Sequence, residues 1–396
     1  MMEASTKKQP FIRTTPNGLQ PPLRVLEILG HATVGGMEVY VRNLIRHLPA
    51  DDFQVTLICP FESPFTTALR QMGCDVYIAP VEDDPRWRSI QLAIEVIRLH
   101  NIDIVHAHMP KAHVLAGLAA RLTGIPAVAT VHGMNITSHE LGIWRAVSST
   151  LVTVCQEAYT QALAMGVHPD RVHLIPNGVD VEMFHPDSDG SAFRASINVP
   201  ADAPLVGFVG RLEWEKGPDQ FLRAAEMVHR RRPDVYFALV GQGGMRNDLL
   251  NLAERLGIGD RVRFAGVRAN MVDVYPAFDI VASSSRSEGM PLSILEAMAC
   301  GRAVVALAVG GVTEIIESEG TGYIVSACDW ENQSWRMLDL LDQPERITRM
   351  GQAARRRAED MFDIRLSATR TADLFRQLVC GDIGRSRRPA EKMLAG

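Results

Sequence analysis

Short apolar runs alternate with helical patterns along most of the chain. The first run, residues 23–29 (LRVLEIL), has the composition of a buried strand and leads through Gly35 and Gly36 into a helix expected over residues 37–48. Further strands are expected at residues 54–59, 76–79, 102–106, 127–132, 151–154 and 172–175. This alternation predicts a doubly wound α/β domain over residues 23–185.

A second alternating set follows residues 186–204, a polar and turn-rich segment that reads as a linker. It predicts a second α/β domain over residues 205–363, and then an amphipathic helix at 364–378 that reaches back to the first domain. Residues 1–22 and 379–396 are expected to be loose tails. The strands of this second domain are expected at 205–209, 235–240, 262–265, 278–283 and 303–309.

Composition narrows the class of protein. The chain has 396 residues, 46% of them hydrophobic and 22% charged, which fits two globular domains. No apolar run approaches a membrane span or a signal peptide, so a cytoplasmic location is expected. The formal net charge of −5 disfavours a nucleic-acid partner, and six cysteines without a CxxC pair disfavour both a zinc site and a disulfide framework.

The stretch from 283 to 311 carries the most informative chemistry. Pro291 fits the first position of a helix over LSILEAMA, so Glu288 is expected in the preceding loop and Glu296 inside the helix. An isolated carboxylate on an apolar helix face needs a partner or a cleft, because burying it alone is expensive. We therefore expect both glutamates to face a ligand, the alternative being two solvated charges.

Two cations occupy one short loop between a strand and a helix. Arg211 and Lys216 lie in GRLEWEKGP, from which both are expected to reach the space above the strand ends and bind a diphosphate. The alternative is a surface ion pairing with Glu213 or Glu215. Gly311, Val312 and Thr313 open a later helix and are expected to offer free backbone N–H groups to a phosphate.

Histidines mark two strand ends in the first domain. His132 directly precedes a glycine and is the better candidate for a functional site. His106 and His108 are weaker candidates, because a lone histidine is more often structural.

Taken in order, these motifs resemble the retaining glycosyltransferases of family 4. The resemblance rests on Gly210-Arg211 to Lys216-Gly217, Phe264-Ala265-Gly266, Glu288 to Glu296 and Gly310-Gly311, and it spans residues 23–378. It implies two facing Rossmann-like domains of the GT-B type with an interdomain cleft. It also implies a nucleotide sugar held by the second domain, an acceptor held by the first, and no metal ion or other cofactor.

The resemblance also implies roles for individual positions. Arg211 and Lys216 would clamp the diphosphate, and Glu296 would accept hydrogen bonds from the ribose. Glu288, Gly289 and Met290 would bind the sugar hydroxyls, and Val267 and Arg268 would contact the base. Gly35 and Gly36 would allow the phosphate close to the first domain, and His132 would line the reacting centre.

One position departs from the family pattern. The family's frequent aromatic-glycine pair after Glu-Gly is Met290-Pro291 here, and Pro291 has no N–H to offer a sugar. The nucleotide base, sugar, acceptor and linkage therefore stay open. The expected function is hexosyl transfer with retention onto a carbohydrate or lipid-linked acceptor, in cell-envelope glycan, polysaccharide or glycolipid synthesis.

Two other functions share this architecture. A sugar-nucleotide epimerase would need carboxylates in the first domain, and Glu38, Asp103 and Glu140 form no recognisable set. A non-catalytic sugar-nucleotide-binding protein would be expected to have lost a clamp cation or a glutamate. A separate alternative concerns Arg86-Trp87-Arg88, which fits weak peripheral contact with the inner face of a membrane, although a surface helix explains the same pattern better.

Overall fold

The computed structural model describes residues 22–33 and 35–385. Of the predicted loose tails, residues 1–21 and 386–396 lie outside these residues, whereas residues 379–385 are helical, so the expectation of a loose tail is wrong for them. The described chain divides into two compact units. The first comprises the chain up to Val131, Thr137–Val152 and the chain from Ala368 onward, and the second comprises His132–Ile136 and Thr153–Ser367.

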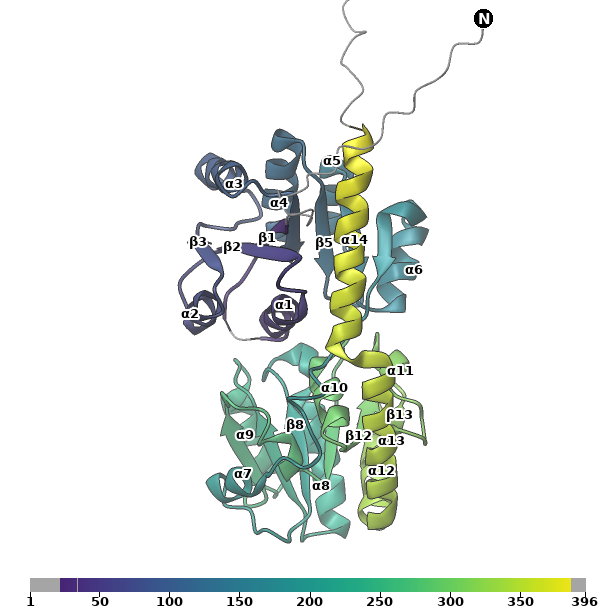
Figure 1. The fold of residues 1–396 in the computed structure, drawn as a ribbon. Helices are drawn as coiled ribbons and strands as arrows, with labels where there is room; N and C mark the ends of the chain where they lie inside the picture. The colour runs from purple at the N-terminus through teal and green to yellow at the C-terminus, as the bar shows by residue number, and fades with distance from the viewer. Residues whose placement is uncertain (1–21, 34, 386–396) are drawn as a thin grey trace, which may run out of the picture. The chain divides into compact units, whose positions relative to one another are not determined.

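The first sheet has seven strands in the order β3-β2-β1-β4-β5-β6-β7 (Figure 1). β1 pairs in parallel with both β2 and β4, so the chain order reverses at β1. The strands are β1 (Leu23–Leu29), β2 (Phe53–Cys59), β3 (Asp75–Ile78), β4 (Ile104–His108), β5 (Ala127–Val131), β6 (Thr150–Thr153) and β7 (Val172–Leu174).

Helices connect these strands, as expected for parallel pairing. They are α1 (Gly36–His47), α2 (Pro64–Gln71), α3 (Trp87–Leu99), α4 (Pro110–Thr123), α5 (Ser138–Val147) and α6 (Gln156–Ala164), with a short 3-10 turn η1 (Pro169–Arg171). β4 extends two residues beyond its predicted end at residue 106. The strand therefore ends at His108, as the expectation of a histidine at its carboxyl end requires, and both His106 and His108 are buried in it.

The second sheet repeats the same topology with six strands in the order β10-β9-β8-β11-β12-β13. Every pair of neighbouring strands in this sheet is parallel, and the chain order reverses at β8. The strands are β8 (Leu205–Val209), β9 (Tyr236–Val240), β10 (Val262–Gly266), β11 (Ile280–Ser283), β12 (Ala303–Leu307) and β13 (Gly322–Val325). The two sheets confirm the predicted α/β class with two Rossmann-like sheets.

The second half of the chain contains most of the remaining helices. They are α7 (Ser191–Ser196), α8 (Pro218–Arg231), α9 (Arg246–Arg255), α10 (Leu292–Ala299), α11 (Val312–Ile315), α12 (Trp330–Leu341), α13 (Pro344–Phe362) and α14 (Ile364–Arg385), with two 3-10 turns, η2 (Trp214–Lys216) and η3 (Tyr275–Ala277). α7 lies inside the segment predicted as a linker. α14 continues to Arg385, beyond the end predicted at residue 378.

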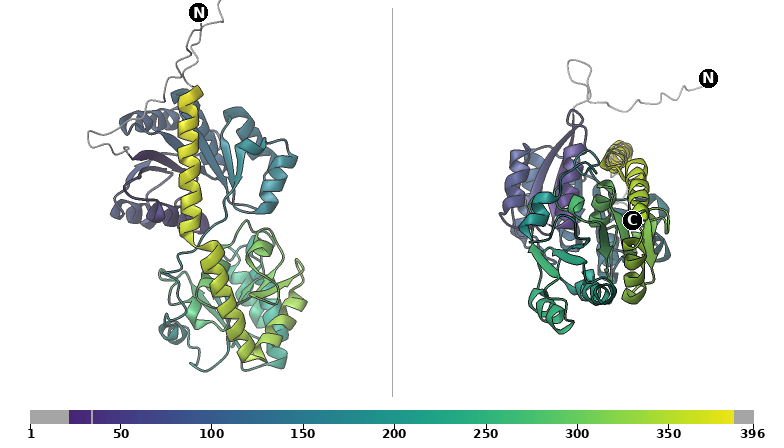
Figure 2. Two further views of the ribbon diagram at one scale, coloured as in Figure 1. Left: turned by 45° about the vertical axis from the view of Figure 1, so that its right-hand side comes forward. Right: turned by 90° about the horizontal axis from the view of Figure 1, so that it is seen from below.

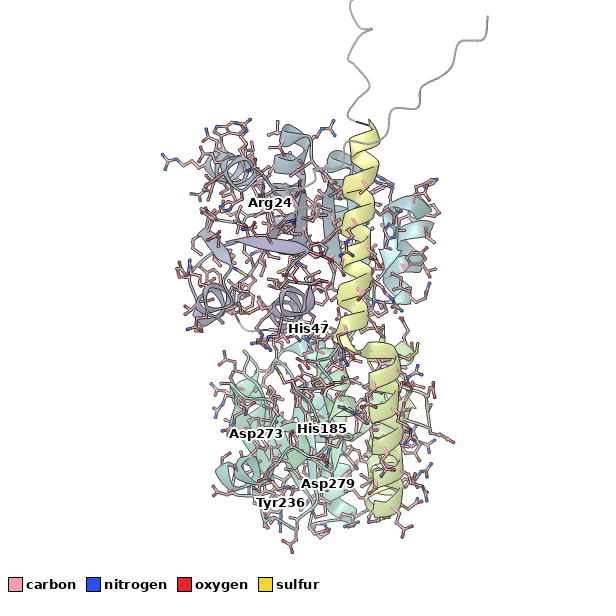
Figure 3. The ribbon with its side chains drawn as sticks, in the orientation of Figure 1. Arg24, His47, His185, Tyr236, Asp273 and Asp279 are labelled. Carbon is pink, nitrogen blue, oxygen red and sulfur yellow. The ribbon has the colours of Figure 1, made fainter. Side chains whose placement is uncertain are left out.

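Asp279 fixes α7 to the start of the second sheet. Asp279 is labelled in Figure 3. Its Oδ2 accepts the Leu205 backbone N–H at 2.7 Å and lies 3.1 Å from a guanidinium nitrogen of Arg194 in α7. The core of this sheet contains aromatic side chains, with Phe208, Phe221 and Phe237 at most 2% exposed. Burial of such apolar side chains is the main stabilising contribution in an α/β unit.

α14 carries the chain from the second unit to the first. Only Asp363 separates it from α13, and its residues from Ala368 onward belong to the first unit (Figure 2). There the ring of Phe375 lies 5.3 Å from the ring of His106, and Arg376 forms an ion pair with Asp52 at 2.7 Å. No helix of residues 22–33 and 35–385 is both long and apolar enough to cross a membrane.

Candidate functional site

The reversal of strand order at β8 identifies the edge where the candidate site lies. In open α/β sheets, ligands bind beyond the carboxyl ends of the strands at such a reversal. Here the two neighbouring strands are β8 and β11. The loops that follow them, residues 210–217 and 284–291, contain Arg211, Lys216 and Glu288.

Lys216 and Glu288 meet across these two loops. The Lys216 Nζ lies 2.7 Å from each carboxylate oxygen of Glu288. Ser285 donates its hydroxyl to Glu288 Oε1 at 2.7 Å. Glu288 is only 8% exposed, so the pair is largely desolvated and removal of one partner would leave the other charge poorly compensated. Lys216 therefore does not form the alternative surface pair with Glu213 or Glu215.

A second ion pair holds the two loops together. Arg286 binds Asp219 in the first turn of α8 through two hydrogen bonds of 2.8 and 2.7 Å. Burial opposes ionisation of Asp219, but the Arg286 guanidinium outweighs it and lowers the pKa of that carboxyl. The Arg286 backbone N–H also donates to the Glu215 carbonyl at 2.7 Å. These bonds fix the position from which Lys216 projects.

Gly217 permits the close approach of the two loops. Its φ is +61°, and a Cβ built there would lie 1.9 Å from the Ser284 carbonyl oxygen. Only glycine fits both the left-handed conformation and this contact. Gln220 in α8 donates to the same Ser284 oxygen at 2.8 Å, so the tight turn is fixed from both sides.

Glu296 is held by a tyrosine that the sequence analysis did not identify. The hydroxyl of Tyr275, in η3, donates to Glu296 Oε2 at 2.6 Å. Tyr275 is fully buried, and burial together with the neighbouring Glu296 carboxylate raises the pKa of Tyr275 well above its usual value. The phenol therefore stays protonated and keeps donating to Glu296.

The helix that carries Glu296 begins one residue later than predicted. α10 starts at Leu292, and Pro291 is its N-cap in an extended conformation, with ψ of 117°. Proline needs no hydrogen-bond acceptor at this position, so the expectation that the helix starts here failed by one residue only. Glu288 lies in the preceding loop and Glu296 inside the helix, as predicted.

The loop 288–290 packs against the segment that begins with His132. A Cβ on Gly289 would lie 2.0 Å from the His132 carbonyl oxygen, so the two backbones touch. Asn177 donates its side-chain N–H to the Met290 carbonyl at 2.8 Å. The structure thus brings His132 beside the Glu288, Gly289 and Met290 segment, all within the second unit.

The backbone N–H groups expected to be free near α11 are partly used inside the chain. Gly311 donates to the Gly289 carbonyl at 2.7 Å, and Val312 donates to the Val309 carbonyl at 3.2 Å. The expectation of three free donors at Gly311, Val312 and Thr313 is therefore wrong for the first two. The reason is that the Gly310-Gly311 turn before the four-residue α11 packs against the backbone of Glu288 and Gly289.

Three further predicted positions, Arg211, Val267 and Arg268, lie in different environments. Arg211 is exposed and forms no ion pair with any described residue. Val267 is 56% exposed, and the guanidinium of Arg268 lies 5.3 Å from the ring centre of Phe193 in α7. Arg211 and the peptide at Val267 are thus accessible to a ligand.

Two predicted glycines lie in the first unit. Gly35 is the N-cap of α1 and Gly36 is its first residue. A Cβ on Gly36 would meet no atom within 4 Å, so nothing in the described chain fills the space beside it. The described residues contain one group of three potential metal ligands, Glu27, His106 and His108, in the core of this unit.

Several residues that shape the site were given no role from the sequence, namely Tyr275, Ser285, Asn177, Gln220 and Asp219. An amide placed between Pro176 and Gly178 in an otherwise apolar segment is a signal for a backbone contact, because buried amides need partners. No comparable signal marks Tyr275.

Comparison with known families covers most of the chain. Residues 34–183 match the family described as Glycosyltransferase Family 4, and residues 190–357 match the family described as Glycosyl transferases group 1.

Two curated relatives and one solved structure extend this finding. The chain is 31% identical to a D-inositol 3-phosphate glycosyltransferase of Saccharomonospora viridis over 69% of this chain and 70% of that protein. It is 26% identical to the Escherichia coli UDP-Gal:alpha-D-GlcNAc-diphosphoundecaprenol alpha-1,3-galactosyltransferase over 84% of this chain and 91% of that protein. The crystal structure of Anabaena Alr3699/HepE in complex with UDP and glucose has a similar fold, with a TM-score of 0.80, 24% identity and coverage of 90% and 100% of the two chains.

Proposed function

This chain belongs to the glycosyltransferases of group 1 and family 4, and from that premise we propose that it binds a nucleotide-diphosphate hexose at Lys216, Glu288 and Glu296. The hexosyl group passes to an acceptor hydroxyl with retention of the anomeric configuration. Neither a metal ion nor another cofactor takes part. Arg211 and Lys216 bind the diphosphate, Glu296 binds the ribose, and the segment from Glu288 to Met290 binds the sugar.

The proposal rests on the ion pair of Lys216 and Glu288, which lies in the loops after β8 and β11, where the strand order reverses. A cation beside a carboxylate suits a nucleotide sugar, whose diphosphate is an anion and whose sugar carries hydroxyl groups. The ammonium group attracts a phosphate oxygen, and the carboxylate accepts hydrogen bonds from sugar hydroxyls.

The same pair supports the chemistry. Cleavage of the bond between the anomeric carbon and the phosphate oxygen leaves positive charge on the sugar and negative charge on the diphosphate. Fixed cations at the diphosphate lower this barrier because they interact more strongly with the departing group than with the bound donor. The acceptor oxygen bonds to the anomeric carbon from the face that the diphosphate leaves, and the acceptor proton passes to a phosphate oxygen.

The acceptor we propose is a carbohydrate or a lipid-linked sugar. The named E. coli relative acts on a diphosphoundecaprenol-linked sugar. On α3, Trp87 is 61% exposed between the exposed Arg86 and Arg88, which suits weak peripheral contact with the inner face of a membrane. Loss of vesicle co-sedimentation in Trp87→Ala would support that contact, and equal sedimentation of both proteins would exclude it.

Calorimetric binding of UDP-, GDP- and ADP-sugars, with and without EDTA, tests the donor site. We expect one nucleotide to bind wild-type protein equally well in both conditions. Glu296→Ala should weaken this binding, whereas Glu226→Ala, which removes a carboxylate on α8 that pairs with Arg230, should not.

The proposal fails if no nucleotide sugar binds, or if binding requires a divalent metal. It also fails if Glu226→Ala weakens binding as much as Glu296→Ala, because the loss of binding would then not come from the Glu296 position itself.

A further inference from the structure

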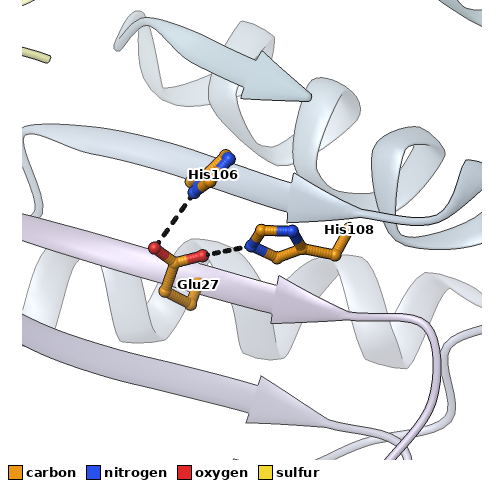
Figure 4. A group of neighbouring side chains, drawn as sticks. All are labelled: Glu27, His106 and His108. Carbon is orange, nitrogen blue, oxygen red and sulfur yellow. Dashed lines mark hydrogen bonds and ion pairs between the residues drawn. The ribbon is translucent and has the colours of Figure 1, made fainter. Parts of the chain in front are cut away.

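Three potential metal ligands meet on one face of the first sheet. Glu27 on β1 lies directly opposite His106 on β4, and His108 follows two residues later on the same face. Glu27 Oε1 is 3.0 Å from His106 Nδ1, and Glu27 Oε2 is 2.8 Å from His108 Nε2 (Figure 4). The two histidine rings are 4.2 Å apart between their centres.

These side chains are closed off from solvent. Glu27, His106 and His108 are all 0% exposed. The ring of Tyr40 in α1 lies 5.8 Å from that of His108, and the ring of Phe375 in α14 lies 5.3 Å from that of His106. Bulk water and substrate therefore have no access to the cluster.

The cluster needs a positive charge. A carboxylate buried this deeply is costly unless a cation compensates it. Among the described residues, no lysine or arginine contacts Glu27. The compensating charge must come from a proton on an imidazole or from a bound cation.

The donor atoms suit a transition metal. Two carboxylate oxygens and two imidazole nitrogens offer four donors, and imidazole with carboxylate is a common set for zinc. Tetrahedral ligands at about 2.0–2.2 Å from zinc lie about 3.3–3.6 Å apart. The observed separations of 3.0 and 2.8 Å are hydrogen-bond lengths, so the carboxylate and the rings would move apart by about 0.5 Å on binding the ion.

The surroundings of His106 also match a metal ligand. Its second ring nitrogen, Nε2, lies 2.7 Å from the hydroxyl oxygen of Thr130 on β5. Histidines that bind metals usually have such a partner on the other nitrogen, which fixes the ring orientation and the tautomer.

We propose that Glu27, His106 and His108 together bind one zinc ion, or a similar divalent transition metal, as a structural site in the core of the first unit. This metal site takes no part in the proposed binding and transfer of the sugar. Because it is closed, the ion enters while the chain folds and joins β1 to β4 beneath α1 and α14. Its loss would destabilise the first unit without removing any donor-binding residue.

Metal analysis of refolded protein tests this proposal. Tag-free protein is unfolded, refolded with zinc chloride or with EDTA, and dialysed, and its zinc content is then measured by mass spectrometry. We expect about one zinc per chain after refolding with zinc, and a higher melting temperature than after refolding with EDTA. Both differences should disappear in Glu27→Gln, which keeps the shape of the side chain. They should persist in His113→Gln, which alters a buried histidine on α4 outside the cluster.

A zinc content far below one per chain in refolded wild-type protein would overturn the proposal. The cluster would then be a carboxylate held by hydrogen bonds to the two imidazoles alone. Zinc retained equally by Glu27→Gln would also overturn it, since the ion would be bound elsewhere. If Glu27→Gln does not fold, the wild-type comparison of zinc and EDTA refolding decides the question.

Discussion

The Lys216 ammonium group lies 2.7 Å from both carboxylate oxygens of Glu288, although 72 residues separate them in the sequence. Each group satisfies the other's charge. Under the proposed function, a bound nucleotide sugar would compete for these partners, its phosphate for Lys216 and its hydroxyls for Glu288.

Replacement of Lys216 by methionine should impair both catalysis and folding stability. We expect kcat/KM to fall by about 10²–10³-fold, because a fixed cation at the leaving group is lost. The melting temperature should fall as well, because Glu288 keeps its charge at 8% exposure without its cation.

The matched control for this variant is Arg223→Met, which removes an exposed cation from α8. Steady-state kinetics and thermal unfolding of both variants check the prediction. Unchanged kcat/KM in folded Lys216→Met would exclude a role for Lys216 at the diphosphate.

Tyr275→Phe should weaken the binding of the nucleotide ribose. The phenol that positions Glu296 is lost, and we expect an affinity decrease of about tenfold, the scale of one hydrogen bond to a charged group. The decrease should be much smaller for a 2′,3′-dideoxy nucleotide, which has no ribose hydroxyls to meet Glu296.

Tyr323→Phe serves as the control because it removes a tyrosine–carboxylate bond to Asp339 elsewhere in the second unit. Calorimetry with both nucleotides distinguishes the outcomes. An equal loss for ribose and dideoxyribose nucleotides would indicate a general structural effect of Tyr275.

Alanine substitutions at Gly217 and Gly257 distinguish the cost of a left-handed backbone from the cost of a steric clash. Both have positive φ, +61° and +70°. A Cβ on Gly257 meets no atom within 4 Å, whereas one on Gly217 would lie 1.9 Å from the Ser284 oxygen. We expect Gly257→Ala to cost about 1–2 kcal/mol from the left-handed backbone alone, and Gly217→Ala to cost more.

Urea unfolding of the two alanine variants measures the difference. Donor affinity should also fall in Gly217→Ala alone, because the loop that carries Lys216 would move. Equal losses of stability and unchanged donor affinity would contradict the assigned contact between the loops.

Acid should destabilise the protein through His113. Burial lowers the pKa of His113 from 6.5 to about 4, while its Nε2 contacts the Ser149 hydroxyl at 2.5 Å. The unfolded chain therefore takes up this proton at higher pH than the folded chain. The resulting stability is fully present above about pH 6.5 and is lost as the pH falls toward about 4, by at most about 1.4 kcal/mol per pH unit.

The free energy of unfolding, measured in urea across this pH range, checks the effect. His113→Gln should flatten the pH dependence relative to wild type, whereas replacement of the exposed His168 by glutamine should not. A wild-type slope that persists unchanged in His113→Gln would assign the acid sensitivity to other groups.

Transfer should proceed without a covalent sugar–enzyme intermediate. We expect NMR of the first product to show the same anomeric configuration as the donor, because attack and departure share one face. Isolation of a sugar adduct on any aspartate or glutamate of the chain, or formation of the opposite anomer, would refute this mechanism.

The sequence predicts much of the fold because the strands are short apolar runs that end at glycines or polar residues. The predicted bounds of β1 and β8 are confirmed for this reason. β13 was missed because its four residues, Gly322–Val325, begin with a glycine and follow a polar turn. α7 was interpreted as linker because its six residues are largely polar.

The site was predictable only in part. The positions of Glu288 and Glu296 relative to α10 follow from local sequence. The pairing of Glu288 with Lys216 depends on β8 lying beside β11, which no local pattern encodes. The contact between Tyr275 and Glu296 depends likewise on the packing of η3 against α10, and their assigned roles at the donor remain predictions.

The route of α14 has a consequence for the order in which the protein is made. The first unit contains the chain from Ala368 onward, so the unit that leaves the ribosome first is completed last. Until α14 arrives, the face of β4 that carries His106 lacks its Phe375 cover. A chain terminated before residue 368 would consequently contain all proposed donor-binding residues of the second unit but an unfinished first unit, and we expect such fragments to bind chaperones during synthesis.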